Sequence, residues 1–372
     1  MTKIGIITHY YGSFNYGGVL QAYALCNFIN TLGFETEQIC YNKKDVVTFR
    51  HKIGSLLRTI KKALHPRVFY YMIKRRKAFV NFRTNIIRHS EKVYTEANLK
   101  ELATVYDIFI TGSDQVWHPN AVCNAYLLDF GITGLKKFSY AASIAKDSLS
   151  ENEKERYKKA LKDFSAISVR EENAVSIISE ISSKDVKWVV DPVFLLDKQE
   201  WMKIIKDSCG KDKYIFCYFL GNDINARNLV KRFAEAKGLK IVTLPYLEGE
   251  YRVSDSNFGD ELLYDITPEE FLGLIKNAEY VFTDSFHAMA FSLIFEKQYF
   301  VFERPSKSSM SSRIESLSKL FNRLDRFCSG HNKTNYEYIE NSSPIDYKEV
   351  CLDFLKLKAM SIEFLKANLA GK

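Results

Sequence analysis

The sequence of 372 residues has no CxxC pair, no HxH or HExxH motif and no uninterrupted apolar run of 18 residues. Its seven cysteines are an odd number and widely scattered, which argues against a disulfide framework and against a cysteine-rich zinc site. Without histidine pairs or carboxylate clusters at metal-ligand spacing, we expect no bound metal. The chain starts with a short strand rather than a signal peptide, and nothing in it is long enough to span a membrane. We therefore expect a cytoplasmic protein with reduced thiols.

The net charge of +8 is unevenly distributed. Residues 50–92 hold 13 Lys and Arg side chains and one acid, Glu91, so this segment carries +12 and the rest of the chain −4. A protein that coats nucleic acid with its whole surface is thereby excluded. Hydrophobic residues make up 46% of the chain and include 27 Phe and 22 Tyr, which is typical of a folded globular protein and not of a disordered one.

Short apolar runs alternate with helical patterns, which predicts βαβ units and mostly parallel sheets. One series ends with a strand at 186–190, and a second begins with a strand at 214–219. We therefore predict an α/β fold with two Rossmann-like domains that face a cleft. The predicted units are an N-terminal domain at 1–208, a C-terminal domain at 209–345, and a segment at 346–372 whose helix packs back on the first domain.

The basic segment is predicted to be a helical insertion at about 46–92 in the N-terminal domain. Apolar residues from Phe49 to Leu64 follow helical spacing, Pro66 interrupts the pattern, and a second helix is predicted at about 67–88. The simplest interpretation is a solvated basic helix face. The alternative is attraction to an anionic membrane surface, where each well-placed Lys or Arg contributes about 1 kcal/mol.

The turn after the first strand is the first candidate site. It contains Asn15, Tyr16, Gly17 and Gly18 and leads into a helix, whose N-terminus offers free N–H groups to an anion. Val19 follows where a P-loop would have Lys, so this is not a P-loop. A tight turn that needs positive φ explains the glycines equally well. We favour a ligand-binding loop because open α/β sheets bind ligands at the carboxyl ends of their strands.

A second candidate site follows the predicted strand at 106–110. Asp114 can act as a base or hold a sugar hydroxyl there, although an Asp at this position can also cap a helix. Trp117 and His118 are candidate walls of a pocket.

Two further strand ends carry residues that suit an anionic substrate. Arg170 can bind a carboxylate or phosphate with two parallel hydrogen bonds, or form an ordinary surface salt bridge. Ser285 is expected to cap the helix that follows it. His287, in the first turn of that helix, can exchange a proton near neutral pH, or it can be a core histidine.

Taken together, these segments resemble the polysaccharide pyruvyl transferase family. The motifs that carry the resemblance lie at 15–18, 112–117, 139–143, 169–171, 191–192 and 283–287, followed by 312–313 and 324–326. The resemblance implies a fold similar to GT-B glycosyltransferases, with the active site between the domains and no cofactor. It also implies that pyruvate is transferred as a ketal from phosphoenolpyruvate to a sugar of a surface polysaccharide or of its lipid-linked precursor.

The resemblance extends to individual residues, with one departure. In the family, an Arg in a Val-Arg-Glu segment and an Arg-x-His pair contact phosphoenolpyruvate; Arg170 and His287 match, but Ser285 stands where the pair has its Arg. Arg313 is a candidate replacement for the missing charge. The alternatives are a nucleotide-sugar glycosyltransferase on the same fold and a non-catalytic module that binds acidic glycans. The expected roles are catalysis by His287 and Asp114; donor binding by Arg170, Ser285, His287 and Arg313; and acceptor binding by Asn15, Tyr16, Gly17, Gly18, Asp114 and Trp117.

Overall fold

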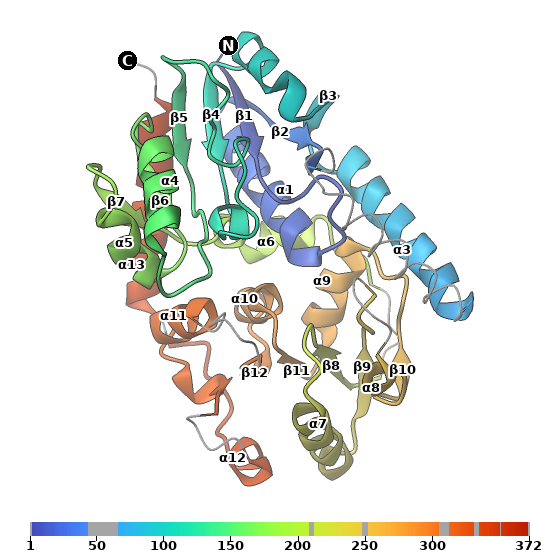
Figure 1. Cartoon of the computed structure of the whole chain (residues 1–372). Coiled ribbons are helices and arrows are strands. Elements are labelled where there is room, and N and C mark those ends of the chain that lie inside the picture. Colours follow the sequence, from blue (N-terminus) through green and yellow to red (C-terminus); the bar gives the residue numbers. More distant parts are fainter. Residues whose placement is uncertain are drawn as a thin grey trace.

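Two parallel sheets organise the chain, one in each half of the sequence (Figure 1). The computed structural model describes residues 2–43, 66–207, 212–247, 252–304, 312–330, 335–349 and 351–370. The predicted α/β class is confirmed, because every strand pair within the two sheets is parallel.

The N-terminal sheet has the strand order β3-β2-β1-β4-β5. A pair of strands, β6 and β7, extends it through isolated parallel bridges between Phe138 and Ala166 and between Ala142 and Val169. The strands are β1 (Lys3–Ile7), β2 (Glu35–Tyr41), β3 (His89–Tyr94), β4 (Ile108–Thr111), β5 (Lys136–Ser139), β6 (Ile167–Val169) and β7 (Val186–Trp188). The α-helices between them are α1 (Tyr16–Thr31), α3 (Pro66–Asn85), α4 (Glu151–Leu161) and α5 (Glu172–Ser179). The label η marks 3-10 helices, here η2 (Glu96–Thr104) and η3 (Gln115–Trp117).

The C-terminal sheet has the order β10-β9-β8-β11-β12-β13. Its strands are β8 (Tyr214–Tyr218), β9 (Lys240–Thr243), β10 (Glu261–Leu262), β11 (Tyr280–Thr283), β12 (Gln298–Phe302) and β13 (Phe327–Cys328). Its helices are α7 (Ile224–Lys237), α8 (Val253–Ser256), α9 (Pro268–Asn277), α10 (Phe286–Ile294), α11 (Ser312–Leu320), η5 (Leu324–Arg326) and α12 (Tyr336–Glu340). Local signals set several boundaries: Thr267 and Glu270 form a capping box at α9, and Gly238 ends α7 in the left-handed conformation.

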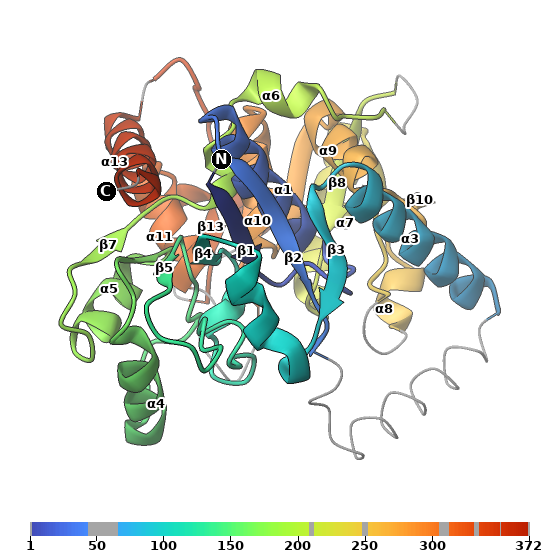
Figure 2. The same cartoon turned by 90° about the horizontal axis from the view of Figure 1, so that it is seen from above.

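The two halves are joined by η4 (Pro192–Phe194) and α6 (Lys198–Met202) and by the last helix, α13 (Leu352–Leu369). Helix α13 packs on the N-terminal sheet: the ring of Phe364 lies 6.1 Å from that of Phe138, and Ser361 Oγ accepts a hydrogen bond from Val190 N. Figure 2 shows α13 beyond the β5 edge of the N-terminal sheet and α3 beside the other edge, at β3.

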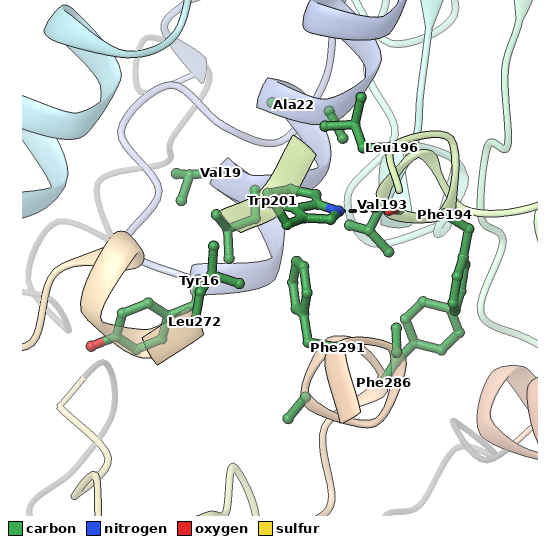
Figure 3. Close-up of a cluster of buried hydrophobic side chains, with 14 of the residues drawn as sticks. Tyr16, Val19, Ala22, Val193, Phe194, Leu196, Trp201, Leu272, Phe286 and Phe291 are labelled. Atoms are coloured by element: carbon green, nitrogen blue, oxygen red, sulfur yellow. Dashed lines mark hydrogen bonds between the residues drawn. The ribbon is translucent and has the colours of Figure 1, made fainter. Parts of the chain in front are cut away.

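One hydrophobic cluster runs through both halves of the chain (Figure 3). Trp201 is fully buried, donates from Nε1 to the carbonyl of Val193, and lies with its ring edge-on to Phe291 of α10 at 4.9 Å. Tyr16 of α1 stacks on Phe271 of α9 at 4.3 Å. Because apolar burial at this seam stabilises one arrangement of the domains, the strand ends of the two sheets are held facing each other.

Most predicted elements are present, and the differences concentrate in the basic segment. Its first predicted helix, 49–64, lies outside the described residues. The second is α3, and the edge strand β3 follows where no strand was predicted. The helix predicted within 346–372 is α13, which starts at Leu352. Among the described residues, no helix is both long and apolar enough to cross a membrane.

Candidate active site

Arg170 lies at the centre of a buried charged cluster where the two domains meet. Its Nη1 donates to Asp191 Oδ2 at 2.7 Å, its Nε lies 3.4 Å from Glu171 Oε1, and its Nη2 lies 3.8 Å from Asp114 Oδ1. Burial alone would lower the pKa of Arg170, but these three carboxylates raise it, so the guanidinium is charged. Its guanidinium carbon also lies 4.6 Å from the ring centre of Phe286. With only 4% of its surface exposed, Arg170 does not form a surface salt bridge.

Asp114 follows β4 with a positive φ of 66° and does not cap the short helix η3, because its side chain makes no capping hydrogen bond. Burial would raise the pKa of this carboxyl, but the nearby Arg170, His287, His9 and Arg313 lower it. Asp114 is therefore an ionised carboxylate, which can accept a proton or a hydroxyl hydrogen bond.

His287 enters the cluster from the C-terminal domain, in the first turn of α10. Its Nε2 lies 3.7 Å from Asp191 Oδ2, and Nδ1 and Cγ of the same ring lie against Gly17 of α1. A Cβ atom on Gly17 would lie only 2.0 Å from His287 Nδ1, so only glycine fits here. Burial would raise the pKa of Asp191, but the neighbouring His287 and Arg170 hold it well below its usual value.

Arg313 reaches the same cluster from α11. With the side-chain amide of Gln115 turned so that its oxygen faces Arg313, Oε1 accepts hydrogen bonds from Nη1 and Nη2 of Arg313, each at 2.9 Å. Burial and the like charge of Arg170 lower the pKa of Arg313 to about 10. The buried guanidinium groups of Arg170 and Arg313 repel each other, and an anion bound between them would relieve this repulsion.

Several buried polar atoms of this cluster have no hydrogen-bond partner: Arg170 Nη2, Arg313 Nε, His287 Nε2 and Glu171 Oε2. Leaving a buried donor unpaired costs about 1–3 kcal/mol, and more for a charged group. Three of the four belong to cationic or basic side chains from two domains. Their concentration here is what a site for a polar, anionic ligand requires.

The structure brings together most of the predicted site residues, but not all of them. Asn15 caps α1, where its Oδ1 accepts from Gly18 N at 3.3 Å, and Ser285 caps α10 as predicted. Tyr16 is buried at the domain seam, where its hydroxyl donates to the carbonyl of Ile266. The pocket-wall interpretation of Trp117 is wrong: its side chain is 0% exposed, and it packs in the core of the N-terminal domain.

The sequence analysis gave no site role to three polar residues that the structure places here: Asp191, Glu171 and His9. Asp191 receives hydrogen bonds from Arg170 and from Ser113 Oγ, and Glu171 accepts one from Ser143. The sequence could have pointed to Asp191, because this residue precedes a proline and directly follows a predicted strand. No such pattern marks His9: its Nε2 donates to the carbonyl of Gln115 while Tyr126 donates to its Nδ1.

The basic helix α3 contributes to the site loop, which the sequence did not predict. Arg75 Nη2 donates to the carbonyl of Phe14 at 3.1 Å, and Arg83 Nη1 donates to that of Ser13 at 2.6 Å. Both arginines are buried. The interpretation of the segment as a wholly solvated basic face is therefore wrong for these two residues. They fix the loop that precedes Gly17.

Within the part of the chain that the structure describes, no group of three or more His, Cys, Asp or Glu side chains could hold a metal ion.

Two facing parallel α/β domains with a charged cluster at their strand ends define a GT-B type of fold. Solved structures agree: UDP-GlcNAc 2-epimerase from Methanocaldococcus jannaschii superposes with a TM-score of 0.55 at 11% identity, over 98% of this chain and 100% of the epimerase. MnaA from S. aureus, solved with UDP, superposes with a TM-score of 0.56 at 12% identity, over 99% of this chain and 97% of MnaA. At such identities the likeness concerns the fold alone.

The sequence is more specific than the fold. No protein of curated function matches it. The family described as polysaccharide pyruvyl transferase matches residues 15–306, which is most of the chain and includes all of the cluster except His9 and Arg313. The chain belongs to this family.

Proposed function

We propose that this protein transfers the pyruvyl group of phosphoenolpyruvate to two hydroxyls of a sugar of a surface polysaccharide or its lipid-linked precursor. The observation that carries this proposal is the set of unpaired buried donors on Arg170, Arg313 and His287. Phosphoenolpyruvate has a phosphate and a carboxylate, both of which suit guanidinium groups. Ser285 supplies no charge in this sequence, and Arg313 supplies the second cation from α11 instead.

The proposed reaction adds one proton to the methylene carbon of phosphoenolpyruvate and forms two new C–O bonds to the sugar. His287 donates a proton to the methylene carbon of the enol, which makes it a methyl group and leaves an oxocarbenium-like centre at the adjacent carbon. The first sugar hydroxyl attacks that centre and loses its proton to Asp114. The C–O bond to phosphate then breaks, and the second hydroxyl closes the ketal as its proton leaves with the phosphate. The sum is phosphoenolpyruvate plus a diol giving a ketal plus phosphate.

Phosphate release from phosphoenolpyruvate, measured against free and lipid-linked galactosides, glucosides and mannosides, tests the activity. Calorimetric binding of phosphoenolpyruvate tests the site separately. Arg170→Gln and Arg313→Gln are each expected to weaken binding about tenfold or more, since a hydrogen bond to a charged group contributes about 1.5–3 kcal/mol. His287→Ala removes one of these donors and is expected to weaken binding about tenfold and to abolish phosphate release.

The matched control is Arg232→Gln, because Arg232 is exposed on α7 and stacks on Tyr336 at 3.9 Å, away from the cluster. Full phosphate release by His287→Ala would refute the role of His287. Thermal stabilisation by UDP- or GDP-sugars and not by phosphoenolpyruvate would favour a glycosyltransferase. Binding of acidic glycans without phosphate release from any acceptor would favour a non-catalytic module.

We also propose that α3 brings the protein to an anionic membrane surface where a lipid-linked acceptor would reside. The exposed side of α3 carries Tyr70, Ile73 and Val80 beside Lys74 and Lys77, a mixture of apolar and basic side chains typical of interfacial helices.

Flotation with anionic liposomes tests the membrane contact. Changing Lys74 and Lys77 to Glu is expected to abolish flotation, since this reverses two charges without touching the buried Arg75. The control reverses Lys158 and Lys159 on α4 in the same way and should leave flotation intact. Equal flotation of all three proteins would show that α3 does not make the membrane contact.

A further inference from the structure

A cavity of about 350 Å³ opens beside the loop that precedes α1. The N-terminal domain contributes the loop residues 12–15 and Arg75 of α3; the C-terminal domain contributes the segments that follow β8, β9 and β12. The cavity therefore lies between the domains at the carboxyl ends of strands from both sheets, where α/β folds bind ligands. Its volume suits a small ligand such as a sugar phosphate.

The lining of this cavity is cationic and aromatic. Arg75 and Arg304 line it from different domains, together with Phe14, Tyr218 and Tyr246, and none of the described lining residues is acidic. A third guanidinium, that of Arg252, lies 4.0 Å from the ring centre of Tyr246. This contrasts with the cluster around Arg170, where three carboxylates accompany the cations.

The two lining arginines are held in place by the surrounding structure. Arg304 Nη2 donates to the carbonyl of Asp284 at 3.0 Å, and its Nε lies 3.5 Å from Asp284 Oδ2. Gly221 makes room for this pair, because a Cβ there would lie 2.7 Å from Asp284 Oδ2 and 3.0 Å from Arg304 Cγ. Arg75 is buried and bonded to the Phe14 carbonyl. Preorganised charges of this kind bind an anion without first having to be ordered.

We infer that this cavity binds a phosphate or diphosphate group attached to the acceptor sugar. The inference rests on the proposed function and deepens it by naming the acceptor class: a sugar phosphate or diphosphate ester rather than a neutral glycan. One guanidinium fork already matches the two oxygens of a carboxylate, whereas a phosphate or diphosphate has further oxygens for a second fork that approaches from another side. Phe14 and Tyr246 provide faces on which a sugar ring can pack.

The position of the cavity fits this role. Asn15 lines it, and Gly17, two residues later, packs against His287. Asp284, which holds Arg304, likewise precedes Ser285 and His287 in the same strand-to-helix turn. A phosphate anchored between Arg75 and Arg304 would leave the attached sugar next to the segments that hold the proposed catalytic groups.

Calorimetry with inorganic pyrophosphate, in the presence and absence of saturating phosphoenolpyruvate, tests the site without a known acceptor. Pyrophosphate is expected to bind the wild-type protein in both conditions. Arg304→Gln is expected to weaken it about tenfold, the effect of losing one charge-assisted hydrogen bond. Affinity for phosphoenolpyruvate should change less than twofold. Arg75→Lys keeps the charge of a buried side chain and should weaken pyrophosphate binding less than Arg304→Gln does. The control Arg232→Gln should not change pyrophosphate binding.

Three results would overturn the inference. Competition between pyrophosphate and phosphoenolpyruvate would mean that both use one anion site. Equal pyrophosphate affinity in the wild type and Arg304→Gln would mean that the cavity does not bind it. Glucuronate binding as tightly as pyrophosphate, with the same dependence on Arg304, would assign the cavity to carboxylate sugars instead. None of these results shows that phosphoenolpyruvate fails to bind at Arg170, so the proposed function stands or falls by its own experiment.

Discussion

The contact between Gly17 and His287 gives a sharp test of the site geometry. A methyl group added at position 17 would lie 2.0 Å from Nδ1 and 2.3 Å from Cγ of the imidazole. Optimal carbon contacts are about 3.5–4.0 Å, so the ring or the start of α1 must move by about 1.5 Å. Overpacking of this kind costs about 1–3 kcal/mol. We expect Gly17→Ala to lower the free energy of unfolding by that amount.

The magnitude can be separated from other effects by a double-mutant cycle. In a His287→Ala background the obstacle is absent, and alanine is a better helix former than glycine by up to about 1 kcal/mol. Gly17→Ala should therefore be neutral or stabilising in that background, which makes the coupling energy about 1–4 kcal/mol. Urea unfolding of the four proteins measures it. Gly330→Ala is the control, since a Cβ there meets nothing within 4 Å.

The same substitution should also affect catalysis. A reacting group displaced by about 1 Å can lose about 100-fold in rate, so Gly17→Ala should lower phosphate release by roughly that factor even when it remains folded. A coupling energy below about 0.5 kcal/mol, the usual limit for independent sites, would refute the packing of the imidazole on Gly17.

Three further predictions follow from the charged cluster and the domain seam. Arg170→Gln leaves Asp191 and Glu171 buried without their cation and should lower the free energy of unfolding by about 3–5 kcal/mol in urea; a loss below 1 kcal/mol would contradict the burial of the pair. The folded-state pKa of Asp191 lies below its unfolded value of about 3.9, so its ionised form stabilises the protein above that pH, and this contribution is lost as the pH falls toward the folded pKa. The stability difference between the wild type and Asp191→Asn should therefore narrow below about pH 4; a difference constant from pH 7 to pH 3 would contradict it. Tyr16→Phe removes the hydrogen bond to the carbonyl of Ile266 and should lower the free energy of unfolding by about 1 kcal/mol, measured by heat or urea. Unchanged stability would mean that the domains separate at this seam.

Local signals made the fold class and most strand ends predictable, but not the partners of the site residues. The strand β3 was missed because its sequence, His-Ser-Glu-Lys-Val-Tyr, has no apolar run; as an edge strand it is buried on only part of one face. Arg75 and Arg83 looked like members of a solvated basic helix because their acceptors, the carbonyls of Phe14 and Ser13, are more than 60 residues away in sequence. Helical periodicity shows which side of a helix is apolar, but it does not show which buried carbonyl lies opposite a basic side chain.

The serine at position 285 shows why the site has to be considered across both domains. An Arg there would place a cation two residues before His287 on the same helix N-terminus, whereas Ser285 uses its hydroxyl to cap α10. Arg313 supplies a cation from α11 and is held by Gln115 of the N-terminal domain. The second cation of the cluster therefore depends on how the domains face each other, which the apolar seam around Tyr16 and Trp201 determines. Affinity for an anionic donor should accordingly be sensitive to substitutions in the seam that contact no ligand.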